Sequence, residues 1–213
     1  MMIERRRVKE VEVMIKHHND LLSHPSEEIY VMNASCGVDM FIIANEESLI
    51  LFNNMFPAFT SISSHEKDKI FKDASLKLNL TVTLYMTKKI FGDVHSKFMH
   101  SIVACYDLEI PFKYYHPEDK GNRDFLESSV NANTDDNIAT FLPLFKRAEL
   151  TEKEICALVA IVIAEHDLSI SEETQDIMDE IRQEILENLQ WYYRNELGLT
   201  DFSIRLGNLM SLN

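Results

Sequence analysis

The chain has 213 residues, of which 46% are hydrophobic and 26% charged, and its formal net charge is −14. This length and composition predict one globular domain, or at most two, with a sizeable buried core. The acidic balance argues against direct binding to nucleic acid, because phosphates are neutralised by Lys and Arg. No apolar run is long enough to span a bilayer, and the charged start does not predict a secretory signal.

The first predicted helix spans residues 4–22 and ends before Pro25. Helical spacing places four apolar residues on one stripe: Val8, Val11, Ile15 and Leu22. Three arginines at 5–7 have the composition of a weak phosphate or nuclear-import patch. They fit a solvated helix end better, because three cations are too few for a binding face.

Two longer helices are predicted at residues 37–56 and 64–91, on either side of a bend at Pro57. Phe56 ends the first of them, since the residue before a proline is disfavoured in the helical region. The bend is unusually rich in large apolar side chains, namely Phe52, Phe56, Phe59, Ile62, Ile70 and Phe71. We therefore expect the two helices to share a core at this point.

Ser63 and Glu66 have the spacing of a capping box and predict the start of the second long helix. Gly92 predicts its end, in the left-handed conformation that glycine accepts. Apolar and polar residues alternate between 74 and 84, which is typical of a strand. Length and capping favour a helix over residues 64–91 instead.

A short β-hairpin is predicted within residues 98–106, which are rich in β-prone side chains. A loop with two prolines follows. Residues 122–148 predict one or two short helices, interrupted by Pro143.

Three helices are predicted in the last third of the chain. Thr151 and Glu154 form another capping box before a helix that is apolar on all sides and is expected to be covered on both. Ser171 caps the next helix, which runs to Gly198 and buries one face: Ile177, Ile181, Ile185, Leu189 and Tyr192. The last helix starts at residues 200–201 and continues to the final residue.

No catalytic motif is found: the sequence has no GxSxG, no HExxH and no glycine-rich phosphate loop. The acidic and His side chains at 165–167 are neighbours at a helix end and point in different directions. His95 and His100 reach one metal ion only if the segment between them folds back. We therefore expect no enzyme activity, no cofactor and no metal. The three cysteines, Cys36, Cys105 and Cys156, are expected to be reduced thiols.

The bend between the two long helices resembles the signature of nuclear-receptor ligand-binding domains. The residues at matching positions are Phe52, Phe56, Pro57, Phe59, Ile62, Ile70, Phe71 and Lys72, with Glu66-Lys67 in place of the family's Asp-Gln. Three later segments resemble the eighth to tenth helices of the divergent nematode branch of this family: 150–161, 170–177 and 205–212. The resemblance extends over about residues 31–213.

This resemblance implies an all-α fold: a three-layer antiparallel helical sandwich with one short β-hairpin, formed as a single unit by residues 1–213. A complete receptor also has a DNA-binding domain with two zinc modules of four cysteines each. Three cysteines do not supply those ligands, so no DNA-binding domain is expected in this chain. The family's activation helix follows the last predicted helix, and it is expected to be missing here.

The resemblance also implies a cavity for a small lipophilic ligand. Ten residues are placed beside it: Ser35, Val38, Asp39, Ile42, Asn45, Leu76, Asn79, Leu80, Thr83 and Met86. Asn45 and Met86 stand where steroid-type receptors have a Glu–Arg clamp, so no steroid-like polar anchor is expected. The alternative is that these side chains fill the space themselves and the domain binds no ligand.

Two protein-binding surfaces follow from the same resemblance. The first is a groove for a coregulator helix of LxxLL type, formed by Ile50, Asn54, Lys67, Phe71 and Lys72. Asn54 replaces the lysine that clamps one end of this helix in the family, so ligand-switched recruitment of a coactivator is not expected. The second is the dimerisation surface, which includes Arg205 and Leu209 and implies a homo- or heterodimer.

These features predict a nuclear-receptor-like regulator of transcription that binds a small lipophilic ligand, partner proteins or both. We expect it in the nucleus, or in both cytoplasm and nucleus, without contact to nucleic acid or membrane. The alternative is a ligand-independent helical module for interaction or dimerisation, derived from a truncated or degenerate receptor.

Overall fold

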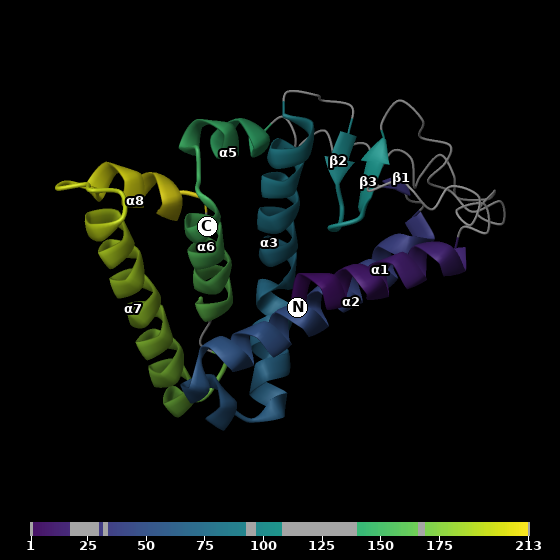
Figure 1. The fold of residues 1–213 in the computed structure, drawn as a ribbon. Coiled ribbons are helices and arrows are strands. Elements are labelled where there is room, and N and C mark those ends of the chain that lie inside the picture. Colours follow the sequence, from purple (N-terminus) through teal and green to yellow (C-terminus); the bar gives the residue numbers. More distant parts are fainter. Residues whose placement is uncertain are drawn as a thin grey trace. The chain divides into compact units, whose positions relative to one another are not determined.

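The computed structural model describes residues 2–17, 30–31, 34–92, 97–107, 140–165 and 169–212. Figure 1 shows a largely helical chain with one small sheet. Its elements in chain order are α1 (Met2–His17), β1 (Tyr30–Val31), α2 (Ala34–Met55), the 3-10 helix η2 (Pro57–Ser61), α3 (Ser64–Phe91), β2 (Lys97–Met99), β3 (Ala104–Asp107), α5 (Leu142–Ala148), α6 (Glu152–Ala164), α7 (Glu172–Asn195) and α8 (Ser203–Met210). The predicted all-α fold with a short hairpin is confirmed. Within the described ranges, no helix is long and apolar enough to cross a membrane.

The chain divides into two compact units. Unit 1 consists of Met1–Glu47 and Thr83–Pro143, and unit 2 consists of Ser48–Val82 and Leu144–Asn213. Both α2 and α3 therefore contribute residues to each unit.

Unit 1 contains α1, the small sheet and the adjoining parts of α2 and α3. β3 is the middle strand, with β1 parallel on one side and β2 antiparallel on the other. The β2–β3 pair is the predicted hairpin, in which Met99 stands opposite Cys105. A small apolar core is formed by Met14, Cys36, Met40, Val103 and Ala104.

The buried face of α1 differs from the predicted stripe. Val8 is exposed, whereas Met14 and the charged Glu10 are fully buried. Glu10 accepts hydrogen bonds from Arg6 Nε at 2.8 Å and from the backbone N–H of Ile102 at 3.2 Å. These donors replace the water molecules that a carboxylate loses on burial. Glu10 can therefore be buried, although hydrophobicity alone predicts that a charged residue faces solvent.

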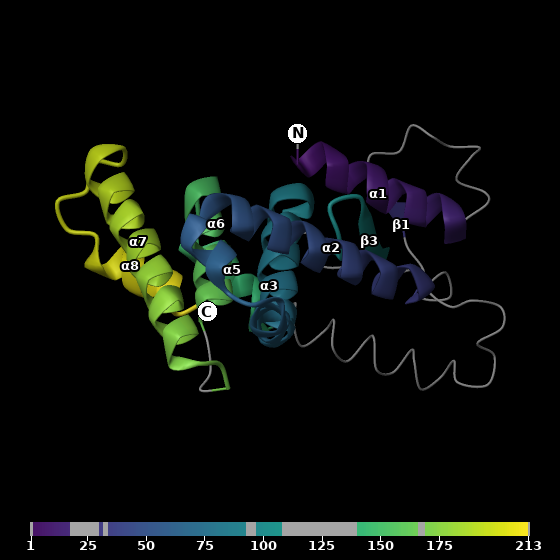
Figure 2. The ribbon, with the colours of Figure 1, turned by 90° about the horizontal axis from the view of Figure 1, so that it is seen from below.

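Unit 2 has the larger core. It is built from the last turns of α2, from η2, from the first half of α3, and from α6 and α7. Figures 1 and 2 both show α6 beside α7, and the two helices are in contact. Seven of the thirteen residues of α6 are buried apolar side chains: Ile155, Leu158, Ala160, Ile161, Val162, Ile163 and Ala164. The predicted burial of this helix on most of its surface is confirmed.

Local signals placed both ends of α3 and the start of α6 correctly. α3 covers the predicted residues without a break, although residues 74–84 alternate like a strand. Gly92 follows it with a φ of 60°, in the left-handed region. At the start of α6, Thr151 Oγ1 accepts from the backbone N–H of Glu154 at 3.3 Å, and Glu154 Oε2 accepts from the Thr151 N–H at 2.8 Å. This is the predicted capping box.

Several predicted boundaries are different in the structure. α2 begins at Ala34 and not at Gly37. Pro143 lies in the first turn of α5, where no intrahelical donor is needed, and the helical path is broken just before it, at the turn residue Phe141. α7 ends at Asn195 and not at Gly198. α8 begins at Ser203 and ends at Met210, before the end of the chain.

Several predictions fall on residues that the structure does not describe. They concern the end of the first helix at 18–22 with Pro25, the proline-containing loop, most of residues 122–148, His95, and the side chains at 166–167.

Candidate functional site

The bend between α2 and α3 is built around four aromatic rings in mutual contact. The centroid of Phe52 lies 4.7 Å from that of Phe56, 4.8 Å from that of Phe59 and 6.3 Å from that of Phe71. The Phe52–Phe59 and Phe52–Phe71 pairs are edge-to-face, which is a favoured geometry for aromatic pairs. All four side chains are buried, so this aromatic junction fixes where the two helices meet.

The backbone of the bend follows from its proline. Phe56 is extended, with φ −120° and ψ 94°, as expected for a residue that precedes a proline. Pro57 then starts η2, where its missing N–H costs nothing in the first turn. The single turn of η2 brings Phe59 back against Phe52, which a continuous helix would not do.

Lys67 covers the outer edge of the aromatic junction. Its Nζ lies 5.1 Å from the centroid of the Phe59 ring and donates to the carbonyl oxygen of Thr60 at 3.2 Å. The ammonium group thus interacts with a ring face and with η2 at once. Its position ties α3 to the bend.

Glu66 links the start of α3 to the start of α7. Its Oε1 accepts from the backbone N–H of Ser171 at 2.8 Å, and its Oε2 accepts from Thr174 Oγ1 at 2.8 Å. Ser63 caps α3 as predicted, since its Oγ accepts from the Glu66 N–H at 3.3 Å. The hydrogen bond from the Ser171 backbone, together with those from the Ser171 and Thr174 side chains, lowers the pKa of Glu66 to about 2.

We expect the Glu66→Gln variant to be less stable near neutral pH and to show a flatter acid dependence than the parent. The pKa of Glu66 is lowered in the folded state. Its contribution to the free energy of unfolding is therefore fully present above its ordinary pKa of 4.5 and is lost as pH falls towards about 2. Urea unfolding at several pH values measures this difference. Parallel stability–pH curves for the two proteins would contradict the assignment.

Glu154 is a fully buried carboxylate at the start of α6. Arg205 of α8 binds both of its oxygens, with Nε 2.6 Å from Oε1 and Nη2 2.7 Å from Oε2. Tyr193 of α7 donates to Oε1 at 3.0 Å. Burial alone raises the pKa of Glu154, but the hydrogen bonds from Arg205 and Thr151 lower it overall. One side chain therefore joins three helices of unit 2.

Comparison of the sequence with protein-family models identifies the family of this domain. The model of the ligand-binding domain of nuclear hormone receptors matches residues 47–213, which is most of the chain and all of unit 2. The chain belongs to the nuclear hormone receptor ligand-binding domain family. No curated protein matches the chain. The helical fold and the aromatic junction are thus those of a nuclear-receptor ligand-binding domain.

The residues proposed for the ligand of this nuclear-receptor domain are divided between the units. Leu76, Asn79 and Leu80 belong to unit 2, and the others belong to unit 1. Thr83 is buried and Leu76 is 75% exposed. The side chains of Ser35 and Val38 lie outside the described residues. The remaining six are partly buried or exposed: Asp39, Ile42, Asn45, Asn79, Leu80 and Met86.

The residues proposed for the coregulator groove of the nuclear-receptor domain all lie in unit 2, near the end of α2 and in the first three turns of α3. Asn54 and Lys72 are exposed, and Ile50 and Lys67 are partly buried. Phe71 is buried in the aromatic junction. The two exposed side chains are the ones that a docked helix reaches without rearrangement of the core.

The residues proposed for the dimer surface are both engaged within unit 2. Arg205 is bonded to Glu154, and Leu209 is fully buried. The apolar side chain that α8 exposes most is Ile204. A partner that meets α8 from outside therefore contacts Ile204 first.

Unit 2 also carries an open groove that the sequence did not predict. It has a volume of about 390 Å³ and lies between the end of α2, α6 and α7. Its lining includes Met55, which is 47% exposed, and Trp191, which is 57% exposed. Trp191 stands on the outer face of α7, beside the predicted apolar stripe that ends at Tyr192. An aromatic residue at such a polar-face position is the only sequence signal for this groove.

None of the three cysteines forms a disulfide, and the part of the chain that the structure describes contains no grouped metal ligands. Cys36 and Cys105 are buried in unit 1, and Cys156 is exposed in unit 2. No three His, Cys, Asp or Glu side chains of the described ranges are arranged to hold a metal ion.

Proposed function

We propose that this chain is a regulator of transcription of nuclear-receptor type, which acts by binding and not by catalysis. Its family membership over residues 47–213 is the observation that supports this proposal most directly. The domain would bind a small lipophilic ligand, partner proteins or both, and we propose residues 1–213 as a single ligand-binding-domain-like unit. We place it in the nucleus, or in both nucleus and cytoplasm, because the nuclear-receptor family is typically nuclear.

The proposed ligand site consists of the ten residues assigned above on α2 and α3. Their mixture of apolar and small polar side chains suits a lipophilic molecule with few hydrogen-bonding groups. The proposed coregulator site is the exposed surface around Asn54 and Lys72. Dimerisation is proposed through the surface that α8 exposes around Ile204. None of these roles requires a bound metal or cofactor.

Native mass spectrometry of the full chain, purified from lipid-rich cells, tests the ligand and the dimer in one measurement. We expect a bound molecule of lipid size that is released on denaturation. The Met86→Trp variant, which adds volume at the proposed site, should lose it, and the Ile204→Trp variant on exposed α8 should retain it. The same spectra report whether the chain is a monomer or a dimer.

A protein that carries no bound small molecule would contradict the ligand-binding proposal. An empty protein that is nevertheless a dimer would support the alternative of a ligand-independent interaction module. A molecule that is retained equally by the parent and by Met86→Trp would place the ligand away from the assigned residues.

A further inference from the structure

The open groove on unit 2 is lined by none of the residues assigned to ligand, coregulator or dimer binding. Its floor is apolar and includes Phe56, Ala160 and Leu189. Met55 and Trp191 stand at its edge with large exposed areas. Trp191 is the only tryptophan of the chain. An exposed tryptophan beside an apolar floor is a common centre of binding energy in protein interfaces.

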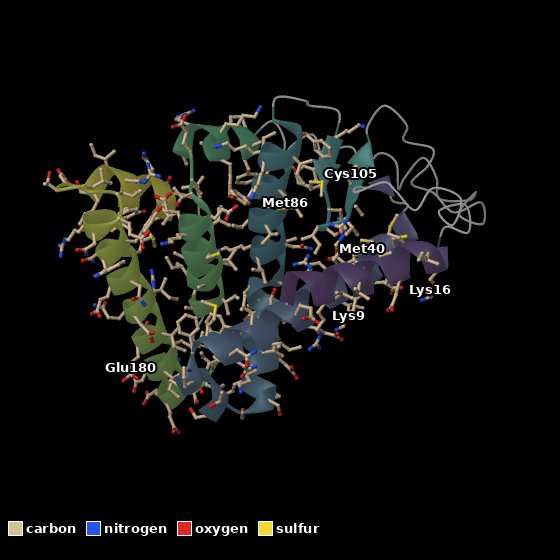
Figure 3. All side chains as sticks on the ribbon, in the orientation of Figure 1. Lys9, Lys16, Met40, Met86, Cys105 and Glu180 are labelled. Atoms are coloured by element: carbon tan, nitrogen blue, oxygen red, sulfur yellow. The ribbon has the colours of Figure 1, made fainter. Side chains whose placement is uncertain are left out.

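The charges around this groove are strongly unbalanced. Lys153 lines the groove, but its Nζ is bound to Glu196 at 2.6 Å and lies 5.1 Å from the Tyr192 ring centroid. Glu184 lines the groove and also a neighbouring depression along α7. That depression is lined by acidic residues and one amide: Asp176, Asp179, Glu180, Gln183, Glu184 and Glu187. Figure 3 shows Glu180 on the outer side of α7.

In the described part of the chain, no cation neutralises this acidic edge. Among the described residues, neither Glu180 nor Glu184 forms an ion pair, and Glu187 accepts a hydrogen bond from the neutral Gln183 at 2.7 Å. The row from Asp176 to Glu187 spans eleven residue steps, or about 17 Å at 1.5 Å per residue. A row of this length matches about three turns of a partner helix.

We propose that the groove and the acidic edge of α7 together bind an amphipathic helix of a partner protein. Its apolar stripe would cover Met55 and Trp191, and Lys or Arg side chains along one border would pair with Glu180, Glu184 and Glu187. A second copy that docks through the same face is a poor occupant, because it presents the same acidic helix. This surface adds to the proposed function and does not depend on a bound ligand.

Trp191 gives the full chain a built-in reporter of occupancy. The probe is a synthetic helical peptide without Trp, with Leu at i, i+4, i+7 and i+11 and Lys beside them. A matched peptide has Glu in place of each Lys. We expect the lysine peptide to shift the Trp191 emission to shorter wavelength, more strongly at low salt, and the glutamate peptide to leave it unchanged.

Variants locate the peptide by fluorescence anisotropy of its labelled form. Trp191→Ala should weaken binding of the lysine peptide by about tenfold or more, and Glu184→Lys should weaken it by about threefold to tenfold. Val8→Ala, which removes an exposed apolar side chain on α1 outside the groove lining and outside every proposed site, should bind like the parent. Circular dichroism checks that each variant is folded.

Three results would overturn the proposal. The first is no binding of the lysine peptide, and the second is equal binding of both peptides. The third is a parent protein that light scattering shows to be a dimer and that Trp191→Ala converts to a monomer, because a second copy of the chain would then occupy the groove.

Discussion

Replacing Arg205 with methionine should lower the free energy of unfolding by about 3 kcal/mol. The substitution keeps an unbranched apolar stem but removes the cation that binds both oxygens of the buried Glu154. Glu154 then retains the hydrogen bonds from Thr151 and Tyr193 but no compensating charge. Urea unfolding of the parent and variant near neutral pH measures the change. Arg147→Met, at an exposed position of α5, is the control and should be close to neutral.

The pH dependence distinguishes a lost ion pair from lost packing. In the parent, the pKa of Glu154 is lowered by folding. Its contribution to stability is therefore present above the ordinary pKa of a Glu side chain and is lost as pH falls. Without Arg205, burial should dominate and raise the pKa of Glu154, so acid should relieve part of the destabilisation. The difference in stability between parent and variant should therefore shrink as pH falls. A difference that is constant with pH would contradict the role assigned to the pair.

The second large effect is expected from Phe59→Ala, which should lower the free energy of unfolding by about 3–5 kcal/mol. Phe59 is fully buried, and its ring contacts Phe52 at 4.8 Å and Phe71 at 6.2 Å between centroids. The variant removes these contacts and leaves a cavity at the bend, where α2, η2 and α3 meet. It also removes the ring under the ammonium group of Lys67.

Two further variants make this result specific. Phe59→Leu should cost less than Phe59→Ala, because it retains much of the buried volume. Leu76→Ala removes a large apolar side chain that is 75% exposed, and should change stability by no more than about 0.5 kcal/mol. A similar loss for Leu76→Ala and Phe59→Ala, measured by urea unfolding, would show that the aromatic junction is not the structural centre of unit 2.

The sequence predicted those features that depend on neighbouring residues. Pro57 ends α2 and starts η2 through the geometry of its own ring, and Gly92 ends α3 because it adopts a positive φ. Thr151 and Glu154 satisfy each other's backbone N–H groups across a single turn. The resemblance to nuclear receptors also depends on neighbouring residues, because its signature is a segment of about twenty residues that forms one local junction.

The features that the sequence did not predict depend on residues distant along the chain. Glu10 is buried because Arg6 and Ile102 supply hydrogen-bond donors. The sequence around Glu10 does not predict the donor from Ile102. The capping box at Ser63 was predicted, but Glu66 uses its carboxylate on Ser171, 105 positions later. The groove beside Trp191 exists only because α2, α6 and α7 meet there. Spacing within one helix does not reveal such a meeting.

The two carboxylates have a joint consequence for α7, because they hold it near both of its ends. Glu66 binds the residues at its first turn, and Glu154 receives the Tyr193 hydroxyl near its last turn. Amide protons along α7 should therefore exchange with solvent only through large opening events, and not through fraying from either terminus. A peptide that settles on α7 meets a surface already in its final shape. The conformational entropy lost on binding is then mainly that of the incoming peptide. Its helical propensity should therefore govern its binding affinity.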